Sequence, residues 1–223
     1  MARTPRAVPI LFDDGELVVV AKPAGVLVVP APGRGGPTLG DLVGRQLGTR
    51  GFAVHRLDED TTGVLALART EAARVELEAV FRSHAAERIY VALVGRMPSP
   101  PAGRITSRLR VGADGVTRSV RDGRGDRAVT EYRALERRRG GVLVLCRLET
   151  GRRNQIRAHL AELGCPIVGD RKYGWRSRPG EPKPARPLLH AWRLRLPWRG
   201  AVVEIEAEPP EAELAVPPGA AAE

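Results

Sequence analysis

Short apolar runs separated by turn residues dominate the hydrophobic pattern of this chain. The first three lie at residues 8–12, 17–21 and 26–29, the second and third are rich in valine, and Asp-Gly and Pro-x-Gly sequences separate them. Valine-rich stretches of about five residues bounded by such turns are typical of β-strands. By the same criteria, further strands are predicted at residues 52–54, 64–68, 89–94, 142–148 and 202–207.

Three longer segments, at residues 104–110, 128–136 and 188–196, alternate between apolar and polar positions. Such alternation is expected where one face of an antiparallel sheet packs on the core and the other faces water. Strands outnumber helices along the chain, and most of the connections between them are short. The pattern therefore predicts an α+β fold, with a mixed, mainly antiparallel sheet flanked by helices and loops.

Apolar residues recur at helical spacing in three segments, residues 38–47, 70–84 and 153–163. The second segment is the clearest, because Thr70 stands where an N-cap is expected and one face of the segment is apolar. The third segment is followed by Gly164, a residue that commonly ends helices. We expect three short helices among the strands.

The domain organisation follows from where composition changes. No stretch with the character of a linker interrupts residues 8–208, so we predict a single domain over that range. Residues 209–223 are rich in proline, alanine and glutamate, and we expect them to form a flexible tail.

Composition excludes several classes of protein. The chain has 223 residues, of which 43% are hydrophobic and 28% charged, as in soluble globular proteins. No apolar run approaches the roughly 18–20 residues of a membrane span, and residues 1–6 lead into no long apolar stretch, so neither a membrane segment nor a signal peptide is expected. Cys146 and Cys165 form no disulfide framework, and the four histidines lack metal-ligand spacing. We expect a cytoplasmic protein without a metal site.

The charge of the chain predicts a polyanionic partner. It holds 36 basic and 26 acidic residues, a net charge of +10, and 33 of the basic residues are arginine. Residues 101–160 hold 15 basic and 6 acidic groups, whereas residues 1–100 hold 12 and 11. The nine aromatic residues form no run suited to stacking bases on a strand. A nucleic acid would therefore be contacted mainly through arginine.

Residues 55–63 combine a histidine, an arginine and an acidic triplet between two apolar runs. Functional residues often lie in such polar connections between buried strands. The alternative is an ordinary solvated turn that is capped by Asp60 or Thr61.

Residues 150–159 open the third predicted helix and place Arg153 and Arg157 four positions apart. Like charges at this spacing repel one another unless an anion such as a phosphate or a carboxylate lies between them. The alternative is that both arginines point into water. Tyr90 lies in an apolar strand, where taken alone it is typical of core packing.

Together these segments resemble the signature motifs of the RluA-type family of RNA pseudouridine synthases. Residues 55–63 match HRLD…[ST]G, residues 88–95 are similar to KxYxAxxxG with arginine for lysine, and residues 150–159 are similar to TGRxHQ[IL]RxH. Asn154 stands where that last motif has histidine. The resemblance runs in the family's order over roughly residues 10–208, with flanking matches at residues 13–25, 166–174 and 189–191.

The resemblance implies a pseudouridine-synthase-type domain that isomerises uridine in RNA without a metal or an organic cofactor. It makes Asp58 the essential carboxylate, acting either as a nucleophile on the ribose or as a base. It also makes Tyr90 the residue that stacks on the uracil. Arg157 would be the partner of the Asp58 carboxylate, since a buried lone carboxylate would otherwise have a raised pKa.

The resemblance and the charge also predict how RNA is held. Arg56 would fill the gap left when the target uridine is flipped out of its stack. The other RNA-binding candidates are Arg152, Arg153, Arg137, Arg138 and Arg139. No S4-like module precedes the first predicted strand, so the catalytic domain itself would capture a ribosomal or a transfer RNA, and a monomer suffices.

Two other functions fit parts of the pattern. One is a non-catalytic RNA-binding or ribosome-assembly protein on the same scaffold, against which the intact Asp58, Tyr90 and Arg157 count. The other is a nucleoside or glycoside hydrolase that uses Asp58 together with Asp60, and it would release a free base or sugar.

Overall fold

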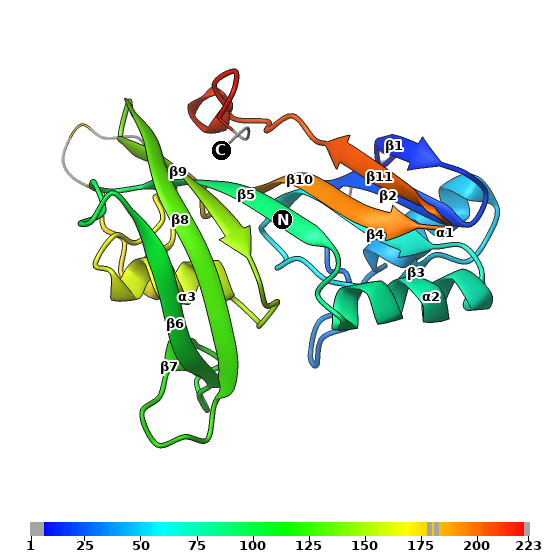
Figure 1. The fold of residues 1–223 in the computed structure, drawn as a ribbon, viewed down its shortest axis with the longest axis horizontal. Coiled ribbons are helices and arrows are strands. Elements are labelled where there is room, and N and C mark those ends of the chain that lie inside the picture. The colour runs from blue at the N-terminus through cyan, green and yellow to red at the C-terminus, as the bar shows by residue number, and fades with distance from the viewer. Residues whose placement is uncertain (1–6, 178–179, 181–182, 221–223) are drawn as a thin grey trace. The chain divides into compact units, whose positions relative to one another are not determined.

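The structure is a computed structural model that describes residues 7–177, 180 and 183–220 (Figure 1). The first six residues, on which the expectation of no signal peptide rests, lie outside the described part. None of the helices in the described part is long and apolar enough to cross a membrane.

Contacts divide the chain into two compact units. Unit 1 comprises the chain up to Arg88 together with Ala191–Glu208. Unit 2 comprises Ile89–His190 and the residues from Pro209 onward. The single domain expected over residues 8–208 stays a prediction.

Unit 1 is built on an antiparallel sheet with two helices. Strands β2 and β4 pair with one another, β1 extends this pair beside β2, β3 pairs with β4, and β10 pairs with β11. The first two residues of β10 belong to unit 2. The elements are β1 (Ile10–Asp13), β2 (Leu17–Lys22), α1 (Leu39–Leu47), β3 (Phe52–Ala53), β4 (Thr62–Ala68), α2 (Glu71–Arg82), β10 (Leu189–Trp198) and β11 (Ala201–Glu206).

Local sequence accounts for most of unit 1. All seven residues of β4 are buried, as expected of a continuous apolar run in the middle of a sheet. Thr38 caps α1 by accepting a hydrogen bond from the amide of Asp41. Thr70 caps α2 in the same way, through the amide of Ala73, which confirms the predicted N-terminus.

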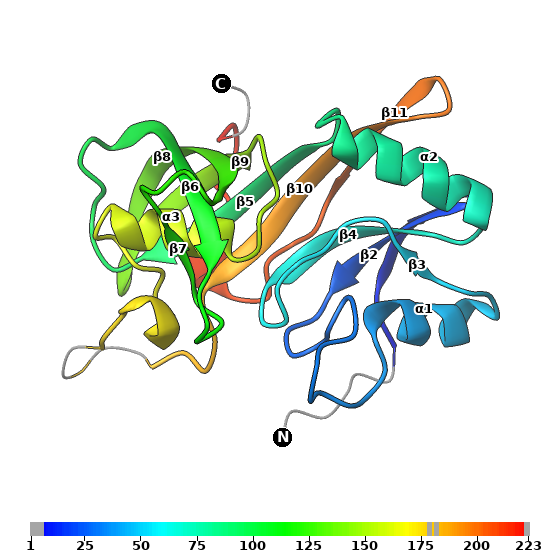
Figure 2. The same cartoon turned by 90° about the horizontal axis from the view of Figure 1, so that it is seen from below.

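Unit 2 contains a second run of antiparallel strands in the order β5-β9-β8-β6-β7. The first two residues of β5 belong to unit 1. Strand β6 alternates between exposed and half-buried residues over most of its length, which confirms the half-polar pattern. Helix α3 packs against β7 and β8 (Figure 2). The elements are β5 (Glu87–Val94), β6 (Ala102–Val111), β7 (Thr117–Ser119), β8 (Asp126–Arg138), β9 (Gly141–Leu148), α3 (Gln155–Glu162) and the short 3-10 helices η1 (Arg171–Tyr173) and η2 (Ala212–Leu214).

The α+β class and the dominance of antiparallel pairing are confirmed, but one predicted strand was wrong and one observed strand was not predicted. Residues 26–29 form no strand, although Val26 and Val28 are buried. Their alternation reflects side-chain burial in an irregular segment, in which Leu27 accepts a backbone hydrogen bond from Leu39 at the start of α1. Conversely, the three-residue strand β7 has too short a pattern to be predicted.

The tail makes defined contacts within unit 2. Leu214 in η2 is completely buried, and Glu211 forms an ion pair with Arg186 (2.6 Å). The carbonyl oxygen of Ala215 accepts a hydrogen bond from Arg138 (3.0 Å). The flexibility expected of residues 209–223 stays a prediction, and these contacts count against it for the part up to Ala215.

Candidate functional site

The loop between β3 and β4 carries the acidic triplet of residues 58–60. Leu57 is buried and anchors the loop, whereas Asp58 is half-buried and Asp60 is exposed. The amide of Thr61 donates to the carbonyl oxygen of Asp58 (3.1 Å), which closes a tight turn, and the amide of Gly25 donates to that of Glu59 (3.0 Å). The loop therefore has a defined backbone on which the Asp58 carboxylate is held.

Lys22, at the end of β2, is 1% exposed and holds this loop from inside the protein. Its ammonium group donates to the carbonyl oxygens of Pro23 (2.9 Å), Glu59 (2.7 Å) and Thr61 (2.9 Å). A buried charge is tolerated when hydrogen bonds replace its hydration, and an ammonium group with three donors matches three carbonyls. Lys22 thus joins the KPxG segment to the loop that carries Asp58.

Gly63 follows the loop at the start of β4 and lies opposite Lys22 in the sheet register. Its φ of +116° is one that residues with a side chain rarely adopt. A Cβ at this position would lie 2.1 Å from the carbonyl oxygen of Ala191 in β10. Both the backbone conformation and the close approach of β10 require glycine in the [ST]G part of the motif.

His55 has a structural environment. Its Nε2 accepts a hydrogen bond from the amide of Ala66 in β4 (2.9 Å), and its ring stacks on Phe81 of α2 with the centroids 4.1 Å apart. Burial, with a smaller contribution from the positive charge of Arg88, lowers the pKa of His55 to about 3. A neutral imidazole is what the accepted hydrogen bond requires, so His55 anchors the motif and is not a proton donor at neutral pH.

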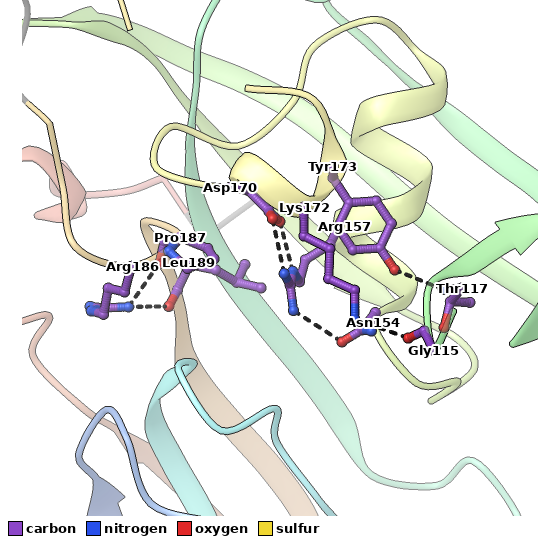
Figure 3. Close-up of polar contacts among 10 residues, drawn as sticks. All are labelled: Gly115, Thr117, Asn154, Arg157, Asp170, Lys172, Tyr173, Arg186, Pro187 and Leu189. Atoms are coloured by element: carbon purple, nitrogen blue, oxygen red, sulfur yellow. Dashed lines mark hydrogen bonds and ion pairs between the residues drawn. The ribbon is translucent and has the colours of Figure 1, made fainter. Parts of the chain in front are cut away.

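Arg157, on α3 of unit 2, is held by three neighbours (Figure 3). Its guanidinium makes a two-pronged ion pair with Asp170, with Nε to Oδ2 at 2.7 Å and Nη2 to Oδ1 at 2.9 Å. Its Nη1 donates to Oδ1 of Asn154 (3.1 Å), and its central carbon lies 4.9 Å from the centre of the Tyr173 ring. The side chain of Asp170 is 1% exposed and that of Arg157 is 13% exposed. The arginine is therefore fixed in orientation by Asn154, which precedes it in the chain, and by Asp170 and Tyr173, which follow it.

Asn154 explains how the chain accommodates its departure from the family motif. It precedes α3 in the left-handed conformation, with φ at +53°. Asparagine tolerates this conformation better than most residues, because its short polar side chain bonds locally. Here the side chain bonds to Arg157, one turn into the helix.

Buried hydrogen bonds tie the TGR segment and α3 to the sheet. The hydroxyl of Thr150 accepts from the amide of Val129 (2.8 Å) and donates to the side chain of Gln155 (2.8 Å), which in turn donates to Thr130 (2.9 Å). His159 bonds to Thr130 through Nδ1 (2.8 Å) and to Ser107 of β6 through Nε2 (3.0 Å). Burial lowers the pKa of His159, which favours its neutral form. Through these hydrogen bonds the polar residues of the motif position the helix on the sheet.

The other predicted residues are placed as follows. Tyr90 is buried in β5, opposite Cys146 of β9. Arg56 is exposed in the unit 1 loop. Arg152 and Arg153, both exposed, line one pocket of unit 2.

The cluster at residues 137–139 divides between two environments. Arg137 and Arg139 are exposed at the end of β8. Arg138 is half-buried, pairs with Glu136 and donates to the tail carbonyl of Ala215. Arg138 is thus engaged in holding the tail, which makes it a weaker candidate for contacting RNA than its neighbours.

Sequence reasoning missed the roles of Lys22 and Asp170. Lys22 is one of three lysines in a chain with 33 arginines. The rarity of lysine indicates a position where a compact ammonium group is needed in place of a planar guanidinium. Asp170 lay within a motif match at residues 166–174, but only the fold shows that it faces Arg157. Among the described residues, no group of three or more His, Cys, Asp or Glu side chains is placed to hold a metal ion.

Comparison with known proteins matches residues 16–162 to a family described as RNA pseudouridylate synthase. The chain is 36% identical to "Ribosomal large subunit pseudouridine synthase D" of Zymomonas mobilis, over 93% of this chain and 71% of that protein. It is 37% identical to the protein of the same name from Nitrosomonas europaea, over 91% of this chain and 62% of that protein. The chain thus spans between three fifths and three quarters of the length of these relatives.

Two solved human structures have similar folds. "Human RNA Pseudouridylate Synthase Domain Containing 4" superposes with a TM-score of 0.75 at 28% identity, covering 91% of this chain and 88% of that one. "Human RNA Pseudouridylate Synthase Domain Containing 1" gives 0.76 at 26% identity, covering 94% and 87%.

Proposed function

The chain belongs to the family of RNA pseudouridylate synthases, and from this premise we propose that Asp58 is the carboxylate on which its isomerisation of uridine depends. The observation that carries the proposal is the construction of the loop. Lys22 and the turn at Thr61 hold a backbone with two half-buried acidic side chains, Asp58 and Glu59. Glu59 forms an ion pair with Arg34, whereas Asp58 is the acid of the HRLD motif. The neighbouring Asp60 is exposed and lies outside the matching part of the motif.

The reaction breaks the N1–C1′ bond of uridine, rotates the uracil and forms a C5–C1′ bond, and the proton of C5 is lost while N1 gains one. Asp58 serves either as a nucleophile at C1′ or as a base, two roles for which carboxylates are used in glycosidic chemistry. We propose that Tyr90 contacts the uracil and that Arg157 supplies positive charge to the reacting groups. The ion pair with Asp170 fixes the orientation of the guanidinium for this role, and it also compensates part of the positive charge of Arg157.

The RNA we propose as substrate is that of the large ribosomal subunit, with transfer RNA as the alternative. The names of the Zymomonas and Nitrosomonas relatives support this choice. The positive charge concentrated in residues 101–160 supports binding to any structured RNA. Arg56, Arg152 and Arg153 are exposed and remain our RNA-binding candidates in this proposal.

Tritium release tests the assignment of Asp58. Wild-type protein incubated with large-subunit ribosomal RNA labelled with [5-³H]uridine should release tritium, because C5 loses its proton. Asp58→Asn should abolish the release and leave RNA binding nearly unchanged. Asp60→Asn is the matched control, since it removes an exposed carboxylate two positions away, and it should retain activity.

Three results would contradict the proposal. Release that survives in Asp58→Asn removes Asp58 from the chemistry. Free uracil among the products, lost in both variants, would instead indicate a hydrolase that uses Asp58 with Asp60. RNA binding without release from ribosomal or transfer RNA would favour a non-catalytic RNA-binding protein.

A further inference from the structure

A pocket of about 340 Å³ lies in unit 2, apart from the residues assigned above to catalysis. Four segments form it: the end of β6, the start of β7, the connection that leads into β8, and the TGR segment before α3. Its volume is at the lower end of the range of about 300–1,000 Å³ that is usual for small-ligand sites. The pocket is large enough for one phosphate group together with part of its sugar.

Four arginines converge on this pocket, namely Arg110, Arg124, Arg152 and Arg153, which we call the arginine pocket. Asp122 neutralises part of this charge through an ion pair with Arg110 (2.8 Å), and Asp126 is the acidic residue of the lining. Two positive charges remain in excess. Because like charges at close range repel, an anion bound among them would relieve the repulsion.

The arginines are held to different degrees. The Nε of Arg152 donates to the carbonyl oxygen of Arg127 (3.1 Å), and its own amide donates to Gln155 (3.0 Å), so this side chain is oriented. For the guanidinium groups of Arg124 and Arg153 the structure gives no acceptor within its described residues. These two are the charges that a ligand would engage.

The lining of the pocket includes a further polar group. Thr117 lines the pocket and is almost fully buried. Its hydroxyl oxygen has no hydrogen-bond partner within the described part of the chain. An unsatisfied buried hydroxyl is costly, and rotation about χ1 would allow it to donate to a ligand oxygen.

We propose that the arginine pocket binds a phosphodiester group of the RNA substrate, at a nucleotide other than the uridine that reacts. Guanidinium groups bind phosphate oxygens in pairs, and a phosphodiester presents two charged non-bridging oxygens to the arginines of the lining. The proposal rests on the proposed function for the identity of the anion as RNA. It adds a second point of attachment that would fix the register of the RNA on unit 2.

Salt-dependent binding tests the pocket directly. The probe is a fluorescent oligouridylate of about 20 nucleotides, titrated by anisotropy at several salt concentrations. Arg124→Ala should weaken binding about fivefold at ~0.1 M salt and lower the slope of log K against log salt by about 0.7, as expected for one lost contact to a single strand. Arg121→Ala is the matched control, because Arg121 is exposed in the same connection but does not line the pocket.

Two further measurements test the proposal, one with a variant that should bind RNA more tightly and one with an uncharged probe. Asp126→Asn removes the acidic charge of the lining and should tighten binding of the oligouridylate. A morpholino of the same sequence, whose backbone is uncharged, should bind wild type and Arg124→Ala equally weakly. Equal effects of Arg121→Ala and Arg124→Ala, or an unchanged salt slope in Arg124→Ala, would overturn the pocket as a phosphate site.

Turnover separates this inference from the proposed function. If wild type releases tritium from ribosomal RNA, Arg124→Ala should raise KM about fivefold and leave kcat unchanged, the pattern of a contact that is equally strong in ground and transition states. An unchanged KM in an active enzyme overturns the pocket alone. An inactive wild type that nevertheless shows the Arg124-dependent salt slope overturns the proposed function and supports the pocket.

Discussion

Lys22 shows how one side chain can define the geometry of a loop. Its ammonium group bonds to three backbone carbonyls, two of which lie 37 and 39 residues further along the chain. A guanidinium, with its planar fork of donors, does not fit three carbonyls around one point. The requirement for a compact cation explains why lysine stands here in a chain that has 33 arginines and only three lysines.

We predict that Lys22→Met destabilises the protein by roughly 3 kcal/mol, since buried carbonyls lose a charged hydrogen-bond donor while side-chain volume is nearly conserved. Urea unfolding measures this loss. Lys172→Met is the control, because Lys172 is exposed and donates to the carbonyl of Gly115 at the surface, so little change is expected. Equal stabilities of the two variants would show that Lys22 does not hold the loop.

The Arg157–Asp170 pair shows the same dependence on a distant partner. At the sequence level, Arg153 and Arg157 were expected to repel one another unless an anion lay between them. The structure supplies a carboxylate for Arg157 from Asp170, 13 residues later, while Arg153 precedes the helix and is exposed. The two arginines therefore do not repel one another strongly, because Arg157 is paired with a carboxylate and Arg153 is exposed to water.

At the scale of elements, helix α3 differs from the amphipathic helix that its spacing predicts. The apolar spacing predicts a buried stripe of Ile156, Leu160 and Leu163. Ile156 and Leu160 are buried, but Leu163 is only half-buried and lies beyond the end of the helix. Gln155 and His159 share the buried face, where hydroxyl groups of β6 and β8 satisfy them. The position of the helix is therefore set by polar partners as well as by apolar contact.

The tail segment η2 provides a test at this scale. If the tail is packed on unit 2 as its contacts indicate, Leu214→Ala should cost roughly 2–3 kcal/mol, because it leaves a cavity at a residue that is 0% exposed. If the tail is flexible, the substitution should have no effect on urea unfolding. Val202→Ala, at a position that is 55% exposed, should change stability by less than about 0.5 kcal/mol.

At the scale of the whole molecule, the charge is unevenly distributed. Residues 101–160, all in unit 2, hold 15 basic and 6 acidic groups, whereas residues 201–223 hold 6 acidic groups and no basic one. Several of the arginines in this block are paired with acids, as Arg104 is with Glu149 and Arg118 with Asp114. Fewer arginines are therefore available to bind RNA than the composition indicates. The positions of those without an acidic partner indicate where RNA would bind.

The stability of the molecule should depend on pH through His55. Its folded pKa of about 3 lies below the ordinary value of 6.5, so the unfolded state binds more protons, and stability is lost as pH falls from about 6.5 toward 3. Between about pH 7 and pH 5 this single group should account for roughly 2 kcal/mol. Burial lowers the pKa of His159 as well, and this adds to the loss in the same direction.

Urea unfolding of wild type and His55→Gln at both pH values isolates this contribution. Glutamine can still accept the hydrogen bond of Ala66 but does not titrate, so the variant should lose less stability on acidification than wild type. An identical pH response in the two proteins would mean that His55 is not held neutral in the folded state.

Local signals in the sequence were enough to predict most strands and all three helices, and to assign the segments that carry Asp58 and Arg157 to a family. Turn residues, apolar periodicity and helix caps act between residues that are close in the chain, so they can be seen without the fold. The roles proposed for Asp58, Tyr90 and Arg157 come from those motifs and stay predictions until the variants are measured.

Other features depended on which distant segments meet. The valine run at 26–29 was misassigned because burial, not strand pairing, explains its pattern. The carbonyls that surround Lys22, the carboxylate that orients Arg157 and the arginine pocket are likewise absent from any local pattern. Solvation and charge pairing are set by neighbours in space, and the chain acquires those neighbours only when it folds.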